Sequence, residues 1–272
     1  MKLEEPPKVS IIMGIYNCES TLKESIESIV NQTYTNWELI MCDDCSKDNT
    51  FNVAKEYKDK YPEKITLIKN DVNLTLGPTL NKCIKLVDGK YIARQDGDDF
   101  SVKERIQKQV EFLEENKIYD LVGCGIVSFD DNGNHGIRML ELIPKKKDLM
   151  RGATFAHATI LIKSKVMKEL DGYSEEEYTN QVEDYHLWFR FFEKGYKGYN
   201  LQETLYYVRE GRDAYKRKNM KRRINEVKVM VEGIRRLRLP TNNYVMLIKP
   251  IIAMIIPNNI LMKYHKNKFR IG

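Results

Sequence analysis

The chain has 272 residues, 42% of them hydrophobic and 31% charged, with a net charge of +6 at pH 7. This composition excludes a disordered or collagen-like chain, and the length allows one large α/β domain with an appendage. The sequence has no run of about 18 apolar residues, so we expect no membrane-spanning helix. Its polar start predicts that there is no signal peptide.

The five cysteines have no regular spacing. Cys42 and Cys45 resemble half of a redox or zinc site, but no second Cys or His pair follows at zinc spacing. We therefore expect five reduced thiols and a cytoplasmic protein.

Strand and helix patterns alternate through the first third of the chain. The predicted strands are 9–15, 38–42, 65–68 and a run ending just before Asp96, and the predicted helices begin near Thr21, Thr50 and Pro78. Thr21 and Glu24 also fit a capping box, in which each side chain caps a free backbone N–H. This β-α-β order at short spacing predicts a Rossmann-like, mainly parallel sheet with helices on both faces.

The alternation is less strict after residue 100. Ser101 and Glu104 fit a second capping box before another helix. Strand patterns follow at 121–127, 137–142 and 155–162, the last with His157 near its start, and a helix pattern follows at 164–170. We therefore expect the second half of the chain to make the sheet mixed rather than purely parallel.

The C-terminal part is basic. Residues 209–238 combine Lys and Arg with apolar residues at helical spacing, and residues 244–256 are apolar but interrupted by Lys249 and Pro250. A basic amphipathic segment beside a short apolar one suits the surface of an anionic bilayer. The alternative is a solvated helix and a hairpin packed on the main domain.

Three carboxylates follow the fourth predicted strand, at Asp96, Asp98 and Asp99. Like charges this close raise each other's pKa unless a cation neutralises them, and Gly97 allows a tight turn between them. Mg²⁺ and Mn²⁺ prefer oxygen ligands, and Mg²⁺ is commonly held by one or two carboxylates plus substrate phosphates. The cluster predicts a metal–diphosphate site; the alternative is a solvated acidic loop.

Two other predicted strands end in distinctive groups, Gly14-Ile15-Tyr16 and Asp43-Asp44. In open α/β sheets the ligand binds outside the carboxyl ends of the strands. An aromatic face, an acceptor carboxylate and an acid cluster would converge there, as a nucleoside diphosphate requires. The sequence contains neither a G-x-G-x-x-G in the first turn nor a P-loop.

A second acidic pair, Glu183 and Asp184, stands in the first turn of a predicted helix with Leu187 and Phe191 on its apolar face. The helix dipole favours anions at this position, so a catalytic base could stay ionised there. The alternative is that the two acids only cap the helix.

With both acidic stretches in place, the sequence resembles the family 2 glycosyltransferases of the GT-A fold. The resemblance spans 9–209 and rests on four ordered blocks, 9–17, 32–50, 89–99 and 157–190. It implies an inverting glycosyltransferase of the type used in bacterial polysaccharide synthesis. The donor would be a nucleotide sugar, more often a UDP-sugar, and the acceptor a hydroxyl of a glycan or polyprenyl-linked sugar.

The resemblance also implies roles for individual residues. Gly14 and Tyr16 would line the base pocket, Asp43 would accept from uracil, and Asp96 would approach the ribose. Asp98, with Asp99 beside it, would hold Mn²⁺ or Mg²⁺, and Asp184 would be the catalytic base.

The sequence departs from the family pattern in two places. Met13-Gly14 stands where Pro-Thr is common, which a pocket made by backbone tolerates. The basic residue that usually precedes Asn81 is absent, so Arg94 and Lys82 are both candidates for supporting the diphosphate.

We divide the chain into a GT-A glycosyltransferase domain, 1–208, and a basic helical C-terminal extension, 209–272. The nucleotide-binding half of the domain is about 9–100 and the acceptor half 101–208. The extension predicts a peripheral association with the inner face of the cell membrane, and we expect no nucleic-acid partner. Two other classes remain: a metal-dependent nucleotidyltransferase, which also needs acids at strand ends, and a nucleic-acid-binding protein using the basic helix.

Overall fold

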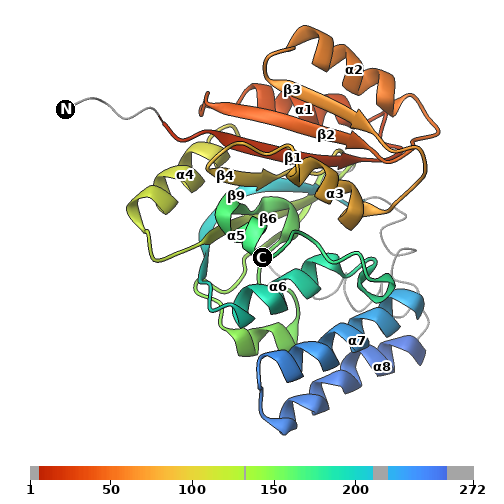
Figure 1. Ribbon diagram of the computed structural model, residues 1–272, viewed down its shortest axis with the longest axis vertical. Coiled ribbons are helices and arrows are strands. Elements are labelled where there is room, and N and C mark those ends of the chain that lie inside the picture. Colours follow the sequence, from red (N-terminus) through yellow and green to blue (C-terminus); the bar gives the residue numbers. More distant parts are fainter. Residues whose placement is uncertain (1–5, 132, 211–219, 256–272) are drawn as a thin grey trace.

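One sheet connects both halves of the chain (Figure 1). The computed structural model describes residues 6–131, 133–210 and 220–255. Within these ranges nine strands form one sheet; eight follow the order β3-β2-β1-β4-β8-β6-β9-β5, and β7 lies off this path and pairs with β6.

The first half has the predicted alternation of strands and helices. Its strands are β1 (Val9–Ile15), β2 (Trp37–Asp43), β3 (Ile65–Lys69) and β4 (Tyr91–Arg94), all parallel. Between them lie α1 (Leu22–Val30), α2 (Thr50–Lys60) and α3 (Leu76–Ile84). These strands are short and mostly apolar, and β1, β2 and β4 are almost entirely buried, which explains why their positions could be predicted from the sequence.

The second half makes the sheet mixed, as predicted. Its elements are β5 (Phe100–Ser101), α4 (Arg105–Glu115), β6 (Leu121–Asp130), β7 (Gly133–Arg138), β8 (Leu161–Lys163), α5 (Ser164–Glu169), α6 (Glu183–Glu193) and β9 (Gly198–Arg209). Short 3-10 turns cover Lys146–Arg151, His157–Thr159 and Glu177–Thr179. Strand β8 runs antiparallel to β4 and β6, whereas β9 runs parallel to β6.

Several local predictions for this half were wrong. His157 lies in a 3-10 turn rather than at the start of a strand, and β7 ends at Arg138 rather than continuing to residue 142. The long strand β9 was not predicted at all.

Both predicted capping boxes are also absent. The Thr21 hydroxyl donates to the carbonyls of Cys18 and Gly97, at 3.2 and 3.1 Å, instead of capping α1. Ser101 lies in β5, where it pairs with Tyr206, and α4 begins only at Arg105. In both cases the residue that the local pattern assigned to the start of a helix interacts instead with a part of the chain that is distant in sequence, Gly97 for Thr21 and Tyr206 for Ser101.

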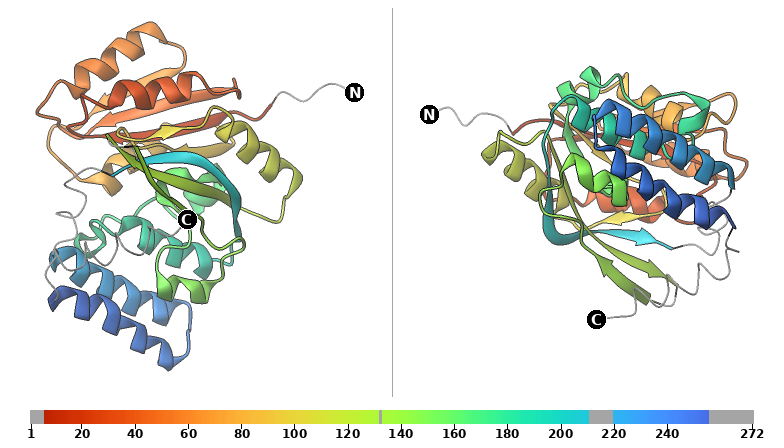
Figure 2. Two further views of the ribbon diagram at one scale, coloured as in Figure 1. Left: turned by 180° about the vertical axis from the view of Figure 1, so that it is seen from behind. Right: turned by 90° about the horizontal axis from the view of Figure 1, so that it is seen from below.

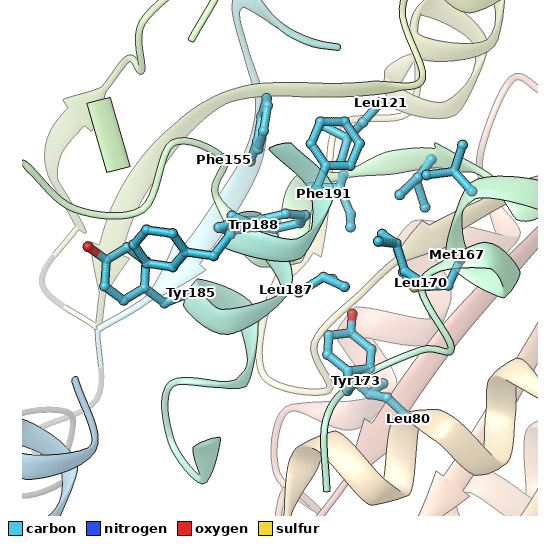
Figure 3. Close-up of a cluster of buried hydrophobic side chains, with 14 of the residues drawn as sticks. Leu80, Leu121, Phe155, Met167, Leu170, Tyr173, Tyr185, Leu187, Trp188 and Phe191 are labelled. Carbon is cyan, nitrogen blue, oxygen red and sulfur yellow. The ribbon is translucent and has the colours of Figure 1, made fainter. Parts of the chain in front are cut away.

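The sheet has a hydrophobic core on each face. On one face the side chains of Ile11, Met13 and Leu39 pack with α1 and α4. On the other face Ile12, Ile40 and Ile92 join a larger core built around α6, whose Trp188 and Phe191 pack edge-on against Phe155 (Figure 3). Helices therefore cover both faces, as the alternating pattern predicted.

The described part of the C-terminal extension is helical. It comprises α7 (Met220–Arg236), a 3-10 turn (Thr241–Leu247) and α8 (Ile248–Ile255). Helix α7 packs so closely on α6 that a Cβ on Gly233 would lie 2.2 Å from the Phe189 ring. Helices α7 and α8 lie side by side at the end of the molecule opposite α2 (Figures 1 and 2). The predicted basic residues beyond 255 lie outside the described residues.

A search of the described helices finds none whose length and hydropathy would let it cross a bilayer. All five cysteines are free thiols, as predicted.

Candidate active site

The carboxyl ends of β2, β1 and β4 lie next to one another. Ile15 pairs with Asp43, and the Asp44 N–H donates to the Ile15 carbonyl at 2.9 Å. On the other side of β1, the Gln95 N–H donates to the Ile12 carbonyl at 3.2 Å. The three strand ends that the sequence singled out therefore converge at one edge of the sheet.

The turn after β4 gathers three carboxylates. Asp96, Asp98 and Asp99 each offer an oxygen, and these oxygens lie within 4.8 Å of one another. Burial, followed by the charges of Asp96 and Asp98, raises the pKa of Asp99 well above its usual range. Gly97 lets the turn pack tightly, because a Cβ there would lie 3.0 Å from the Cys18 sulfur and 3.2 Å from Ile15 Cγ2.

The buried side chains of Arg94 and Gln95 hold this turn in place. Arg94 donates to both carboxylate oxygens of Asp96, at 3.0 and 2.5 Å, and is itself buried. Burial works to lower the pKa of Arg94, but the neighbouring Asp96 outweighs it and raises the pKa above its usual value. Gln95 donates to the Asp99 carbonyl at 3.0 Å and accepts from the Ser101 hydroxyl at 2.7 Å. The acid cluster is thus a built turn rather than a loose acidic loop.

Strand β9 supplies contacts to the turn that sequence reasoning missed. The Tyr206 hydroxyl accepts from the Asp96 N–H at 3.0 Å, and the Arg209 N–H donates to Asp99 Oδ1 at 2.8 Å. Both contacts join residues 110 positions apart. No local signal in the sequence could have assigned them.

The end of β2 places a buried acceptor carboxylate next to the end of β1. Asp43 is fully buried; its Oδ2 accepts from the Ser46 N–H at 3.2 Å. Its Oδ1 is buried and has no hydrogen-bond partner among the described residues. Tyr16, just beyond β1, is 48% exposed. An unpartnered buried acceptor is costly, so a donor from a ligand would stabilise it.

Asp44 has a different task from Asp43. Its carboxylate accepts the N–H groups of Leu74 and Thr75, at 2.8 and 3.0 Å, and the Asn70 amide at 2.7 Å. It therefore fixes the loop that leads into α3.

The start of α3 links the first strand to the second acidic pair. A Cβ on Gly14 would lie 3.1 Å from Leu76 Cδ1, so glycine there lets α3 approach β1. One residue further on, a Cβ on Gly77 would lie 3.5 Å from Glu183 Cβ. The first turn of α6 consequently lies beside the strand ends.

Glu183 and Asp184 share an electrostatic environment. Burial and then the charge of Asp184 raise the pKa of Glu183 to about 7. Burial also raises the pKa of Asp184, which its own contact with the Tyr185 N–H (2.7 Å) and the nearby Arg222 and Arg94 partly counteract. Arg94 therefore acts on both acidic stretches and connects them electrostatically.

His157, part of the fourth sequence block, lies between these stretches. Its Nε2 lies 2.7 Å from the Tyr173 hydroxyl, and its ring contacts Trp188 of α6. Burial, with Arg94 nearby, lowers the pKa of His157 well below its usual value. The imidazole is therefore neutral near pH 7, and it acts here as a hydrogen-bonding partner of the Tyr173 hydroxyl.

Comparison with known proteins identifies the class. The model of the family described as "Glycosyl transferase family 2" matches residues 10–167. EpsE of Bacillus subtilis (strain 168), whose assignment as a glycosyltransferase is itself provisional, is 47% identical over 262 residues; the match covers 96% of this chain and 94% of EpsE. The chain therefore belongs to glycosyl transferase family 2 and is a glycosyltransferase.

Two further comparisons agree. The Escherichia coli protein WfaP, named UDP-Glc:alpha-D-GlcNAc-diphosphoundecaprenol beta-1,3-glucosyltransferase, is 31% identical, over 81% of this chain and 85% of WfaP. The solved structure of the mannosyltransferase PcManGT from Pyrobaculum calidifontis, in complex with GDP-Man and Mn²⁺, superposes with a TM-score of 0.67 at 15% identity. That match covers 96% of this chain and 80% of PcManGT. The predicted GT-A fold and family are confirmed, and the enzyme class is glycosyl rather than nucleotidyl transfer.

Proposed function

We propose that this enzyme moves a sugar from a UDP-sugar to a hydroxyl of a glycan or polyprenyl-linked acceptor, with inversion and with the help of a divalent cation, in cell-surface polysaccharide synthesis. One observation carries this proposal. The carboxylate turn at Asp96, Asp98 and Asp99 lies at the same edge of the sheet as the Glu183–Asp184 pair. The name of WfaP, which specifies a UDP-sugar donor and a diphosphoundecaprenol-linked acceptor, supports the substrate classes.

The nucleotide would occupy the ends of β1 and β2. Tyr16 would stack on the base, and the unpartnered Asp43 Oδ1 would accept an N–H of uracil. Gly14 would line the same pocket while allowing α3 to approach. Asp96, held by Arg94, would face the ribose, so Arg94 would act by orienting Asp96.

The donor set of the acid turn fits a divalent cation. Carboxylate oxygens are the ligands that Mg²⁺ and Mn²⁺ prefer. Burial and then the charges of Asp96 and Asp98 raise the pKa of Asp99, and a cation would relieve the repulsion among the three carboxylates. Asp98 and Asp99 would hold the ion. When bound, such an ion neutralises charge on the departing nucleoside diphosphate.

Asp184 would take the proton from the acceptor hydroxyl, whose oxygen attacks the anomeric carbon as the bond to the diphosphate breaks. One displacement inverts the configuration at that carbon. The nearby Arg222 and Arg94 favour the ionised carboxylate that this step requires, although burial opposes it. Burial and then the charge of Asp184 raise the pKa of Glu183 to about 7, so the two acids together carry less negative charge near neutral pH than two ordinary carboxylates would.

A screen of nucleotide sugars tests the proposal. Purified enzyme with Mn²⁺ is incubated with UDP-sugars and GDP-sugars, and release of the nucleoside diphosphate is measured with and without EDTA. We expect metal-dependent release of UDP. Release only from GDP-sugars would overturn the UDP assignment, and release unaffected by EDTA would overturn the metal assignment.

Tyr16→Ala is expected to weaken UDP binding by about 1–3 kcal/mol, the range for loss of base stacking on an aromatic ring. Calorimetry with UDP measures the loss. Tyr244→Ala, which removes another exposed tyrosine far along the chain, is the matched control and should bind like wild type. Equal affinities of the two variants would remove Tyr16 from the site.

We propose that the C-terminal extension, residues 209–272 as divided from the domain at 1–208, docks the cytoplasmic enzyme on the inner face of the membrane. Helix α8 and the turn before it expose Val245, Ile248, Ile251 and Ile252, of which Val245 is 62% exposed. These positions follow helical spacing and form one apolar stripe. Because the same extension is rich in Lys and Arg, the stripe suits an anionic lipid surface.

The full chain is expected to bind vesicles containing phosphatidylglycerol and to be released by salt, because each basic residue near an anionic surface contributes about 1 kcal/mol that salt screens. Sedimentation with anionic and with neutral vesicles measures this. The double variant Ile248→Ser, Ile252→Ser should bind more weakly. Equal partitioning onto both vesicle types would contradict the docking proposal.

A further inference from the structure

The end of β9 is fastened to the metal turn at several points. Strand β5, which directly follows the turn, pairs with β9 so that Phe100 faces Tyr207, and their rings stack at 4.5 Å. The Tyr206 hydroxyl and the Arg209 N–H then contact Asp96 and Asp99, respectively. The turn is therefore held between β4, where it begins, and β9, which lies far away in the sequence.

The guanidinium of Arg209 makes a further contact with the turn. Its Nε donates to the Asp98 carbonyl at 3.2 Å, its Nη2 lies 2.5 Å from a Glu24 carboxylate oxygen on α1, and it lies 4.5 Å from the Phe129 ring centre. Arg209 thus joins the turn, α1 and β6. The peptide group between Asp98 and Asp99 cannot rotate without breaking the Nε contact.

We propose that Arg209 is a positioning residue, which holds the Asp98–Asp99 peptide so that both carboxylates point at a common divalent cation. This inference rests on the proposed metal site. The backbone N–H of Arg209 fixes one oxygen of Asp99, and the guanidinium fixes the carbonyl that precedes it. Together they set the direction of both side chains against a repulsion that would otherwise spread the three carboxylates apart.

The arrangement separates two jobs between two arginines. Arg94 is buried and neutralises Asp96 through its side chain. The guanidinium of Arg209 instead donates to a backbone carbonyl of the turn, that of Asp98, and pairs with Glu24 and Asp131 outside the acid cluster. Its removal should therefore weaken metal binding through geometry while leaving the carboxylate ligands in place.

The experiment measures Mn²⁺ binding by the full chain, from the electron paramagnetic resonance signal of free Mn²⁺, with saturating UDP and separately with GDP. The variants are Arg209→Gln, Asp98→Asn and, as a matched control, Arg236→Gln, whose guanidinium pairs with Glu232 on α7. We expect Arg209→Gln to raise the Mn²⁺ dissociation constant about tenfold. A change of this size corresponds to the loss of one hydrogen bond made by a charged group. UDP affinity in EDTA and the melting temperature should stay near wild type, and Arg236→Gln should bind Mn²⁺ normally.

A second substitution guards against a folding defect. Arg209→Lys keeps the charge, but one ammonium group cannot reproduce the planar fork that serves the Asp98 carbonyl and Glu24 together. It should therefore also weaken Mn²⁺ binding. Wild-type Mn²⁺ affinity in either folded Arg209 variant, while Asp98→Asn loses affinity, overturns the positioning role alone. Unchanged affinity in Asp98→Asn, or no Mn²⁺ binding by wild type, overturns the proposed metal site and this inference with it.

Discussion

Asp98→Asn is expected to abolish metal-dependent sugar transfer while leaving the fold intact. The substitution removes one ligand charge from a turn where three carboxylate oxygens lie within 4.8 Å of one another. Because like charges repel there, removing one should not lower the melting temperature. Nucleoside diphosphate release with Mn²⁺ supplied in excess measures activity, and thermal unfolding measures stability.

Asp59→Asn is the control for this substitution, since Asp59 is exposed on α2 and lies in no acidic cluster found among the described residues. It should retain both activity and metal dependence. Full activity of Asp98→Asn at any Mn²⁺ concentration would contradict the assignment of Asp98 as a metal ligand. Loss of activity together with a large fall in melting temperature would show that the residue is needed for the turn itself.

The nucleotide-binding half was predictable because its signals are local. Short buried parallel strands leave continuous apolar runs, and each run ends where the chain reaches the edge of the sheet. Asp43 ends one such run and Asp96 stands two residues after the end of β4, so their convergence required only the rule that parallel strands end together.

The acceptor half was less predictable because its contacts are distant in sequence. Strand β9 contains Asn200, Gln202 and Glu203, which break an apolar alternation, and its pairing with β6 shifts register near Gly125. Asn200 is buried, where its amide donates to the carbonyls of Glu141 and Thr154. A buried polar residue whose amide N–H groups bond to distant carbonyls looks like a loop residue when only the sequence is known.

Arg94 shows a related limit. From the sequence, Arg94 and Lys82 were both candidates for supporting the diphosphate, because the basic residue that usually precedes Asn81 is absent. In the structure Arg94 lies beneath the cluster, paired with Asp96, and it acts electrostatically on His157 and Asp184 as well. A motif does not predict whether an arginine at the end of a strand is buried under the following turn or faces the ligand, because that depends on how the whole sheet packs.

Asp184→Asn is expected to lower sugar transfer by about 10²–10⁴-fold, the range for loss of a general base, while donor affinity stays near wild type. Asparagine keeps the shape of the side chain and an oxygen that can accept from the Tyr185 N–H, a contact of 2.7 Å in the wild type. It cannot take a proton from the acceptor. Single-turnover transfer and calorimetric donor binding, measured on the same preparation, separate the two effects.

The pH dependence gives a second measurement. A base must be unprotonated, so the transfer rate should rise as pH increases through the pKa of Asp184. Burial raises that pKa, and the acid limb of the wild-type profile should therefore lie above the pKa of about 3.9 typical of an exposed aspartate. The residual activity of Asp184→Asn should lack this limb.

Asp171→Asn is the matched control, because Asp171 is exposed and has a φ of 54°, which asparagine adopts readily. Three outcomes for Asp184→Asn then distinguish three roles. Unchanged transfer and stability would mean that Asp184 only supports the first turn of α6. A parallel fall in donor affinity and transfer would mean that it contacts the donor or its cation. A fall in transfer alone, with the acid limb gone, would identify Asp184 as the group that activates the acceptor.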